Sequence, residues 1–167
     1  PSKANPKFYN GDIPWATVRD MKFNVIKETE HKITKEAVRE SSANIIPRNN
    51  VIIATRVGLG KICFLENDTA INQDLKGIIP INSNELFIYY LYYWLNSISE
   101  IIVKNGTGAT VQGVKLPFIK SLKIPLPPLP EQRRIVAILD KAFAAIAKAK
   151  ENAEKNWQNA RELFESV

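Results

Sequence analysis

The most constraining feature of this sequence is its C-terminal segment, because no proline or glycine interrupts residues 131–167. Alanine, glutamate, lysine, arginine and leucine dominate the segment, and these residues favour a helix. The prolines of residues 125–130 disfavour both helix and strand and predict a stiff, extended linker. We therefore predict one uninterrupted helix over residues 131–167, with a length of about 55 Å.

Small and apolar residues recur along this helix in alternating steps of four and three, the spacing of a coiled-coil seam. Alanine at many of these positions would let two helices approach closely, and we expect pairing with a second copy of the chain or with another segment. The alternative is an amphipathic helix that folds back on its own domain through Phe143, Trp157 and Phe164. The predicted seam consists of Ile135, Leu139, Ala142, Ile146, Ala149, Ala153, Asn156, Ala160 and Leu163.

Residues 1–124 have the pattern of a mixed globular domain with short strands and a few helices. A β-branched run, Val51 to Arg56, and a second apolar run, Lys61 to Leu65, lie on either side of Gly58 and Gly60. This arrangement predicts a hairpin over residues 50–66. The fold class that we expect is therefore α+β, followed by one long C-terminal helix of the coiled-coil type.

Further along the domain, we expect a single helix from Asn84 to about Lys104, capped by Ser83. Its buried stripe would hold the apolar residues at helical spacing, and short strands are expected around residues 114–118 and 122–124. The residues of the stripe are Leu91, Leu95, Ile98 and Ile102.

The net charge of +6 is concentrated in the front of the chain. Residues 131–167 hold seven basic and six acidic side chains, so they are nearly neutral, and the rest of the chain carries the excess. A basic surface of this kind favours contact with phosphates. Charge alone fits a merely soluble basic protein equally well.

The residues needed for catalysis are scarce. Cys63 and His31 are the only cysteine and the only histidine, so we expect no metal site, no nucleophilic relay and no cofactor. Cys63 lies in an apolar run and is expected in the core, which is compatible with a cytoplasmic protein. Glu30-His31-Lys32 has the acidic–x–lysine spacing of some Mg²⁺-dependent nucleases, but no strand clearly carries it, and we expect His31 in a solvated loop.

The proline linker that runs into Glu131-Gln132-Arg133-Arg134-Ile135 resembles the specificity subunits of type I restriction–modification enzymes. Three other segments agree with this family in the same order along the chain: residues 11–15 (Gly-Asp-Ile-Pro-Trp), residues 71–77 (Ile-Asn-Gln-Asp-Leu-Lys-Gly) and residues 106–110 (Gly-Thr-Gly-Ala-Thr).

The resemblance implies a non-catalytic target recognition domain over residues 1–124, followed by the linker and a spacer helix. In the family, two such units are inverted, their helices pair antiparallel, and each domain reads half of a bipartite double-stranded DNA site. Modification subunits then methylate adenine with S-adenosylmethionine, and a restriction subunit uses ATP and Mg²⁺. Only one domain and one helix are present here, and the family's opening segment is missing, so we expect a half-length subunit or a fragment.

Basic side chains near turns are expected to bind phosphates, and polar side chains at loop tips to read base edges. Asn72, Gln73 and Asp74 are expected either to take part or only to stabilise a turn. Competing hypotheses are a protein-interaction domain with a dimerising helix and, less favoured, a small nuclease. The predicted DNA contacts are Arg19, Lys22, Arg56, Lys61, Lys104, Asn105, Thr107, Thr110, Gln112 and Lys115.

Overall fold

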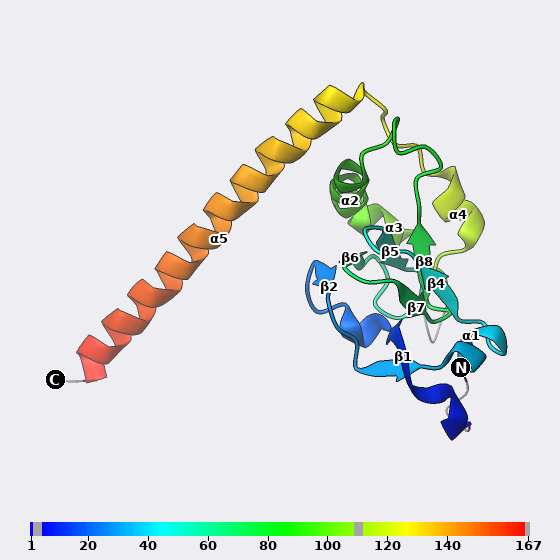
Figure 1. Ribbon diagram of the computed structural model, residues 1–167. Coiled ribbons are helices and arrows are strands. Elements are labelled where there is room, and N and C mark those ends of the chain that lie inside the picture. Colours follow the sequence, from blue (N-terminus) through cyan, green and yellow to red (C-terminus); the bar gives the residue numbers. More distant parts are fainter. Residues whose placement is uncertain (2–4, 109–111, 166–167) are drawn as a thin grey trace. The chain divides into compact units, whose positions relative to one another are not determined.

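The computed structural model describes residues 1, 5–108 and 112–165, and it divides the chain into two compact units, Pro1–Leu126 and Pro127–Val167. The first unit combines two four-stranded sheets with short helices, and the second contains one long helix (Figure 1). The expected α+β class with a long C-terminal helix is therefore confirmed. Within the described residues, no helix has the length and apolarity to cross a membrane.

The first sheet has the strand order β3-β1-β7-β4. Strand β1 (Tyr9–Ala16) pairs antiparallel with β3 (His31–Ile33) and parallel with β7 (Thr69–Ile71). Strand β4 (Asn44–Ile46) pairs antiparallel with β7. Helix α1 (Lys35–Arg39) follows β3, and Thr34 caps it by accepting a hydrogen bond from the N–H of Ala37.

The second sheet has the order β2-β6-β5-β8. Strands β5 (Val51–Ala54) and β6 (Ile62–Leu65) pair antiparallel, which confirms the predicted hairpin. Strand β8 (Leu75–Ile78) pairs antiparallel with β5, and β2 (Val25–Ile26) pairs parallel with β6.

Both faces of the β5–β6 hairpin are buried, which explains why its strands are apolar at every position. Ile52 and Cys63 contribute to one core cluster, together with residues of the first sheet. Val51 and Phe64 contribute to another cluster, formed with the helices that follow the second sheet. Burial raises the pKa of the Cys63 thiol to about 11, as expected for a core cysteine.

The region expected to form one helix contains two, so this expectation was wrong. Helix α2 (Ile88–Ser97) is separated from α3 (Ser99–Lys104) at Ile98, and Phe87, rather than Ser83, occupies the N-cap. Asn82 explains the late start, because its carbonyl accepts the N–H groups of Glu85 and Leu86 in a turn. Its side chain accepts the N–H of Asn84 and completes this turn.

The strands expected around residues 114–118 and 122–124 were also wrong. Residues Leu116–Ser121 form helix α4, and residues 122–128 have no regular secondary structure. Pro117 explains the difference, because a proline fits the first turn of a helix, where its missing N–H group has no intrahelical partner.

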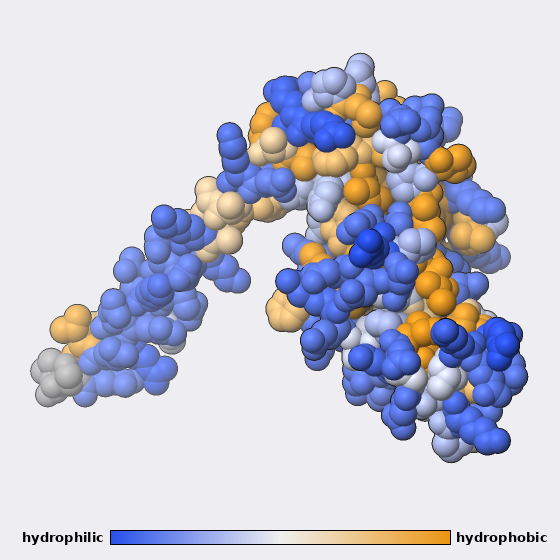
Figure 2. Space-filling view, in the orientation of Figure 1, coloured by the Kyte–Doolittle hydropathy of each residue, from blue (hydrophilic) through white to orange (hydrophobic). Residues whose placement is uncertain are grey.

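The second unit holds helix α5 (Leu129–Glu165), which begins slightly earlier than the sequence predicted. Three ion pairs stabilise it, Glu131–Arg134, Glu151–Lys155 and Arg161–Glu165, each with an N–O distance of 2.7 Å. From Asp140 to Glu165 every side chain is exposed. Figure 2 shows a mainly hydrophilic surface along this helix, with hydrophobic groups near its end.

Gly11 provides a test of the first sheet. Strand β1 has an irregular register between Tyr9 and Ile13, and there Gly11 lies against the backbone of Ile33 and Thr34. Because an added Cβ would overlap these backbone atoms, Gly11→Ala should lower the free energy of unfolding by about 1–3 kcal/mol. Urea denaturation measures this loss as a lower midpoint with an unchanged slope.

Asp12→Ala is the matched control, because Asp12 is the exposed neighbour of Gly11 on the same strand. This variant should unfold at nearly the wild-type midpoint. Equal midpoints for the two variants would show that the close approach at Gly11 does not constrain the sheet.

Candidate nucleic-acid interface

The centre of the candidate interface is the loop that connects β5 to β6. Gly58 and Gly60 have positive φ angles of 70° and 84°, which side-chain-bearing residues rarely adopt. Hydrogen bonds close the loop, since the N–H of Lys61 donates to Gly58 (3.1 Å) and that of Gly60 donates to Ala54 (3.2 Å). We call residues 55–61 the glycine loop.

The glycine loop is in close contact with segments on two sides. A Cβ on Gly58 would meet the side chain of Val18, and a Cβ on Gly60 would meet the side chain of Val103 and the carbonyl of Ser99. The two glycines therefore allow this loop to lie between the segment after β1 and helix α3.

A second loop, of which the structure describes residues 105–108 and 112–113, is attached to the glycine loop. Thr107 and Gly113 exchange backbone hydrogen bonds of 2.9 and 3.0 Å, and these bonds close the base of the second loop. The N–H of Val114 then donates to the carbonyl of Thr55 at 2.9 Å. One backbone hydrogen bond thus joins the end of the second loop to the start of the glycine loop.

Four of the predicted DNA contacts meet around these loops. Arg56, Lys61 and Gln112 line one shallow hollow of the surface, and Lys61 and Lys104 line another. All four side chains are exposed. Lysine and arginine can bind phosphates there, and an exposed glutamine can read a base edge.

Arg19 and Lys22 lie on the neighbouring segment, whose first part is the 3₁₀ turn η2 (Val18–Asp20). Both residues are exposed, and together they line a broad surface hollow of about 1080 Å³. Lys61 joins this segment to the glycine loop, because its Nζ donates to the carbonyl of Met21 at 3.5 Å.

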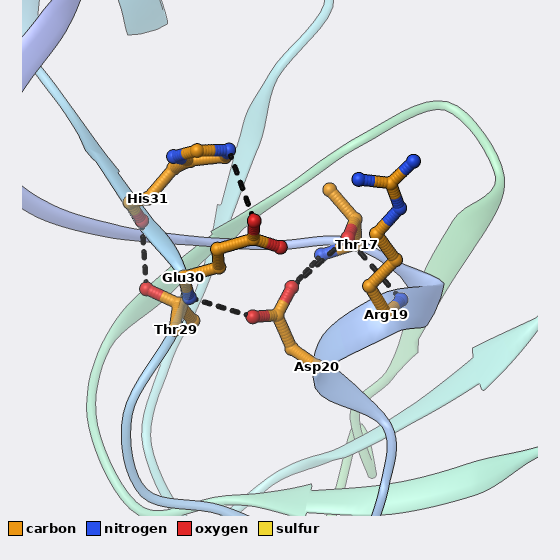
Figure 3. A network of polar contacts seen from close by, with 6 residues as sticks. All are labelled: Thr17, Arg19, Asp20, Thr29, Glu30 and His31. Atoms are coloured by element: carbon orange, nitrogen blue, oxygen red, sulfur yellow. Dashed lines mark hydrogen bonds and ion pairs between the residues drawn. The ribbon is translucent and has the colours of Figure 1, made fainter.

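Asp20 fixes the shape of this segment (Figure 3). Its Oδ2 accepts hydrogen bonds from the N–H (2.8 Å) and hydroxyl (3.0 Å) of Thr17, and its Oδ1 accepts the N–H of Glu30 at 2.7 Å. Thr17 in turn accepts the N–H of Arg19 at 3.3 Å. These bonds hold the turn that carries Arg19 against the start of β3.

The remaining predicted contacts lie at different places. The side-chain amide of Asn105 donates to the carbonyl of Ile101 at 2.9 Å, so it stabilises the end of α3. Thr107 is exposed at the base of its loop, and Lys115 is exposed at the N-cap of α4. Thr110 lies outside the described residues. The structure therefore groups Arg56, Lys61, Lys104 and Gln112 most closely.

Asp74, for which the sequence left both a DNA contact and a turn-stabilising role open, belongs to this surface. Its carboxylate forms an ion pair with Arg56, with 3.4 Å between Oδ1 and Nη1. Asn72 and Asp74 also form a turn, as the sequence allowed, because the side chain of Asn72 accepts the N–H of Asp74. No local pattern predicted the ion pair, which depends on the long-range pairing of β5 with β8.

The Glu30-His31-Lys32 segment differs from its prediction, because β3 includes His31 and Lys32. The ring of His31 stacks on Trp15, with 6.4 Å between their centroids, so this histidine does not lie in a loop. Asp20 is the carboxylate beside Glu30, and both its oxygens already accept backbone N–H groups. The described part of the chain contains no group of three or more residues that could hold a metal ion.

Sequence comparison identifies similar proteins. A family model described as "Type I restriction modification DNA specificity domain" matches residues 1–155. The specificity subunit of the type I restriction enzyme EcoR124I/EcoR124II of Escherichia coli is 36% identical over 148 residues, covering 84% of this chain and 36% of that protein. The MjaIX specificity subunit of Methanocaldococcus jannaschii is 30% identical over 171 residues, covering 99% of this chain and 39% of that protein.

Solved structures show the same fold. One solved structure comes from work on the complex assembly and conformational transition of the type I R-M system. It superposes on this chain with a TM-score of 0.79 at 22% identity, over 98% of this chain and 39% of that one. The HsdS subunit of Thermoanaerobacter tengcongensis superposes with a TM-score of 0.71 at 22% identity, over 87% of this chain and 34% of that one. The chain thus spans well under half the length of these relatives. It belongs to the family of type I restriction–modification DNA specificity domains.

Proposed function

We propose that this chain is a DNA-reading unit of a type I restriction–modification specificity subunit. Its first unit would bind one half of a bipartite double-stranded DNA site. The observation that carries this proposal is the meeting of Arg56, Lys61, Lys104 and Gln112 around the glycine loop, in a member of a DNA specificity family. Loops on a rigid framework suit this role, because turns can reach base edges while the sheets hold them in place.

In this proposal the chain carries out no chemistry of its own. It positions modification subunits, which would use S-adenosylmethionine, and a restriction subunit, which would use ATP and Mg²⁺. We expect this assembly to work in the cytoplasm, where its DNA and nucleotides are found.

Helix α5 would act as the spacer and pairing element. The chain covers 36% and 39% of the length of the two relatives, so two such units together approach a full-length subunit. If the two units are copies of this chain, the protein is symmetric, and its target should be a symmetric pair of half-sites.

The ion pairs of α5 support pairing through the predicted seam, which we call the alanine seam after Ala142, Ala149, Ala153 and Ala160. On the heptad repeat of the seam, Glu151, Lys155, Arg161 and Glu165 all take outward positions. Apart from Asn156, the seam itself consists of alanines and larger aliphatic residues. A helix whose ion pairs lie away from an uncharged seam suits close contact with a second helix.

The leading alternative is a protein-interaction domain that does not bind DNA. The two hypotheses differ in their response to salt, because binding to phosphates releases counterions and weakens steeply as salt rises. DNA affinity that hardly changes with salt would favour the alternative.

Neutralising the lysines of the glycine loop and of α3 tests the DNA surface. Lys61→Ala and Lys104→Ala should each weaken DNA binding about equally for all sequences. Each should also reduce the slope of log affinity against log salt by about 1, because one phosphate contact is lost. Fluorescence anisotropy over a salt series measures both quantities, with the chain alone and with a modification subunit added.

Lys35→Ala is the matched control, since it removes the same charge from the exposed start of α1. Its affinity and salt slope should equal those of the wild type. If all three variants behave alike, the glycine loop does not belong to the DNA surface.

The pairing role of α5 is tested by adding one charge to the seam. Ala149→Glu should separate paired chains, because it places a carboxylate between two closely packed helices. Light scattering should then report the mass of a single chain, where the wild type reports a larger assembly.

Ala147→Glu makes the same change two residues earlier, at an outward position of the heptad. It should leave the mass of the assembly unchanged. Pairing through α5 would be contradicted if the wild type had the mass of one chain when alone and if its complex with a modification subunit contained only one copy of the chain.

A further inference from the structure

We infer that Arg56 reads a guanine in the DNA target and that Asp74 is the residue that positions it. This inference rests on the proposed function and adds to it, because it assigns base reading to one side chain and separates that side chain from the neighbouring lysines. The argument depends on how differently the structure holds these cations.

The ion pair between Arg56 and Asp74 is asymmetric. The side chain of Asp74 is only 14% exposed, whereas that of Arg56 is 52% exposed. The side chain of Asp74 is therefore largely buried, whereas that of Arg56 extends into solvent. The contact uses Nη1 of the guanidinium group, at 3.4 Å from Oδ1 of Asp74.

Asp74 is itself held on several sides. Its Oδ2 accepts hydrogen bonds from the side chains of Asn72 (3.2 Å) and Gln73 (3.5 Å). Its carbonyl accepts the N–H of Thr55 at 2.8 Å and the hydroxyl of Thr55 at 3.1 Å. The second carboxylate oxygen is thus engaged, and the backbone of Asp74 is fixed to the residue that precedes Arg56.

The stem of Arg56 is confined as well. A Cβ placed on Gly113 would meet Cγ of Arg56 and the carbonyl of Thr55, each at 3.0 Å. The glycine therefore allows its own backbone to lie directly against the aliphatic part of this side chain. An arginine held at its stem and at one terminal nitrogen loses less conformational entropy when it binds DNA.

The chemistry of the guanidinium group selects the base. Arginine presents several N–H donors in a planar fork, and a fork of two donors matches O6 and N7 of guanine in the major groove. With Nη1 facing Asp74, the Nε and Nη2 donors remain for that edge. The contact with the carboxylate restrains Nη1 of the fork, a restraint that a phosphate contact would not need.

The stem of Lys61 also lies close to Gly58, but no carboxylate of the described residues pairs with Lys61 or Lys104, and the two lysines suit phosphates. The Nζ of Lys61 has one long contact, 3.5 Å to the carbonyl of Met21, and Lys104 is exposed at the last turn of α3. An ammonium group is a point charge without a planar fork, so it adds affinity without strong base preference.

Selection from a randomised double-stranded DNA library, followed by sequencing, tests this inference. The wild-type chain, with its modification subunit where one is needed for binding, should enrich a motif that contains a guanine. Arg56→Lys should reduce the preference for that guanine about 10- to 100-fold and leave the other positions unchanged. Because the charge is kept, the salt slope should stay at its wild-type value.

Asp74→Asn keeps the size of the side chain and removes the ion pair. It should weaken the preference at the same guanine, and it should have no further effect on that preference in the Arg56→Lys background. Any loss of stability, measured by urea denaturation, should in contrast be similar in both backgrounds. This difference separates positioning from a purely structural role.

The outcomes separate the inference from the function on which it rests. A wild type that enriches no motif contradicts the proposed function itself. A motif whose guanine preference survives in Arg56→Lys overturns the inference and leaves the function intact. An Asp74→Asn variant that keeps its preference for guanine, or loses it equally in the Arg56→Lys background, overturns the positioning role of Asp74.

Discussion

The double burial of the β5–β6 hairpin is the constraint on which the rest of the first unit depends. Ile52 and Cys63 face one core, Val51 and Phe64 face the other, and the period of two in a strand makes this division obligatory. A slip of one residue would exchange the two faces, so the register is strongly specified. Because the register is fixed, the glycine loop must emerge at one place, between η2 and α3. The position of the candidate interface thus follows from core packing.

A loop fixed in this way can carry charges that lie outside the cores. Arg56, Lys61 and Lys104 are exposed, and the two cores contain none of them. Asp74 is different, because it links the charged surface to the framework through the backbone of Thr55. The sheet restrains Asp74, and Asp74 in turn restrains the exposed side chain of Arg56. Binding by such a side chain costs less conformational entropy than binding by a mobile one.

Local patterns in the sequence predicted local structure. The hairpin and the long helix each depend on residues that are neighbours along the chain, and the structure contains both. The break at Ile98 was missed because the apolar stripe continues through it: Ile102 is fully buried on the far side of the break. Helix α4 was missed because the sequence around Pro117 was interpreted as extended, although proline also fits a first helical turn. The partnership of Arg56 with Asp74 required the pairing of distant strands, which no local pattern reveals.

Under the proposed function, the division of the chain into two units has a consequence for how target specificity can change. The glycine loop and the described residues of the second loop are held by the first unit, whereas the alanine seam belongs to α5 in the second. Substitutions at loop tips therefore need not alter the surface through which the helices would pair. Conversely, the outward ion pairs of α5 leave its seam uncharged whatever the loops contain. A reading surface and a pairing surface that share no residues can change independently, provided that the β5–β6 hairpin keeps its register.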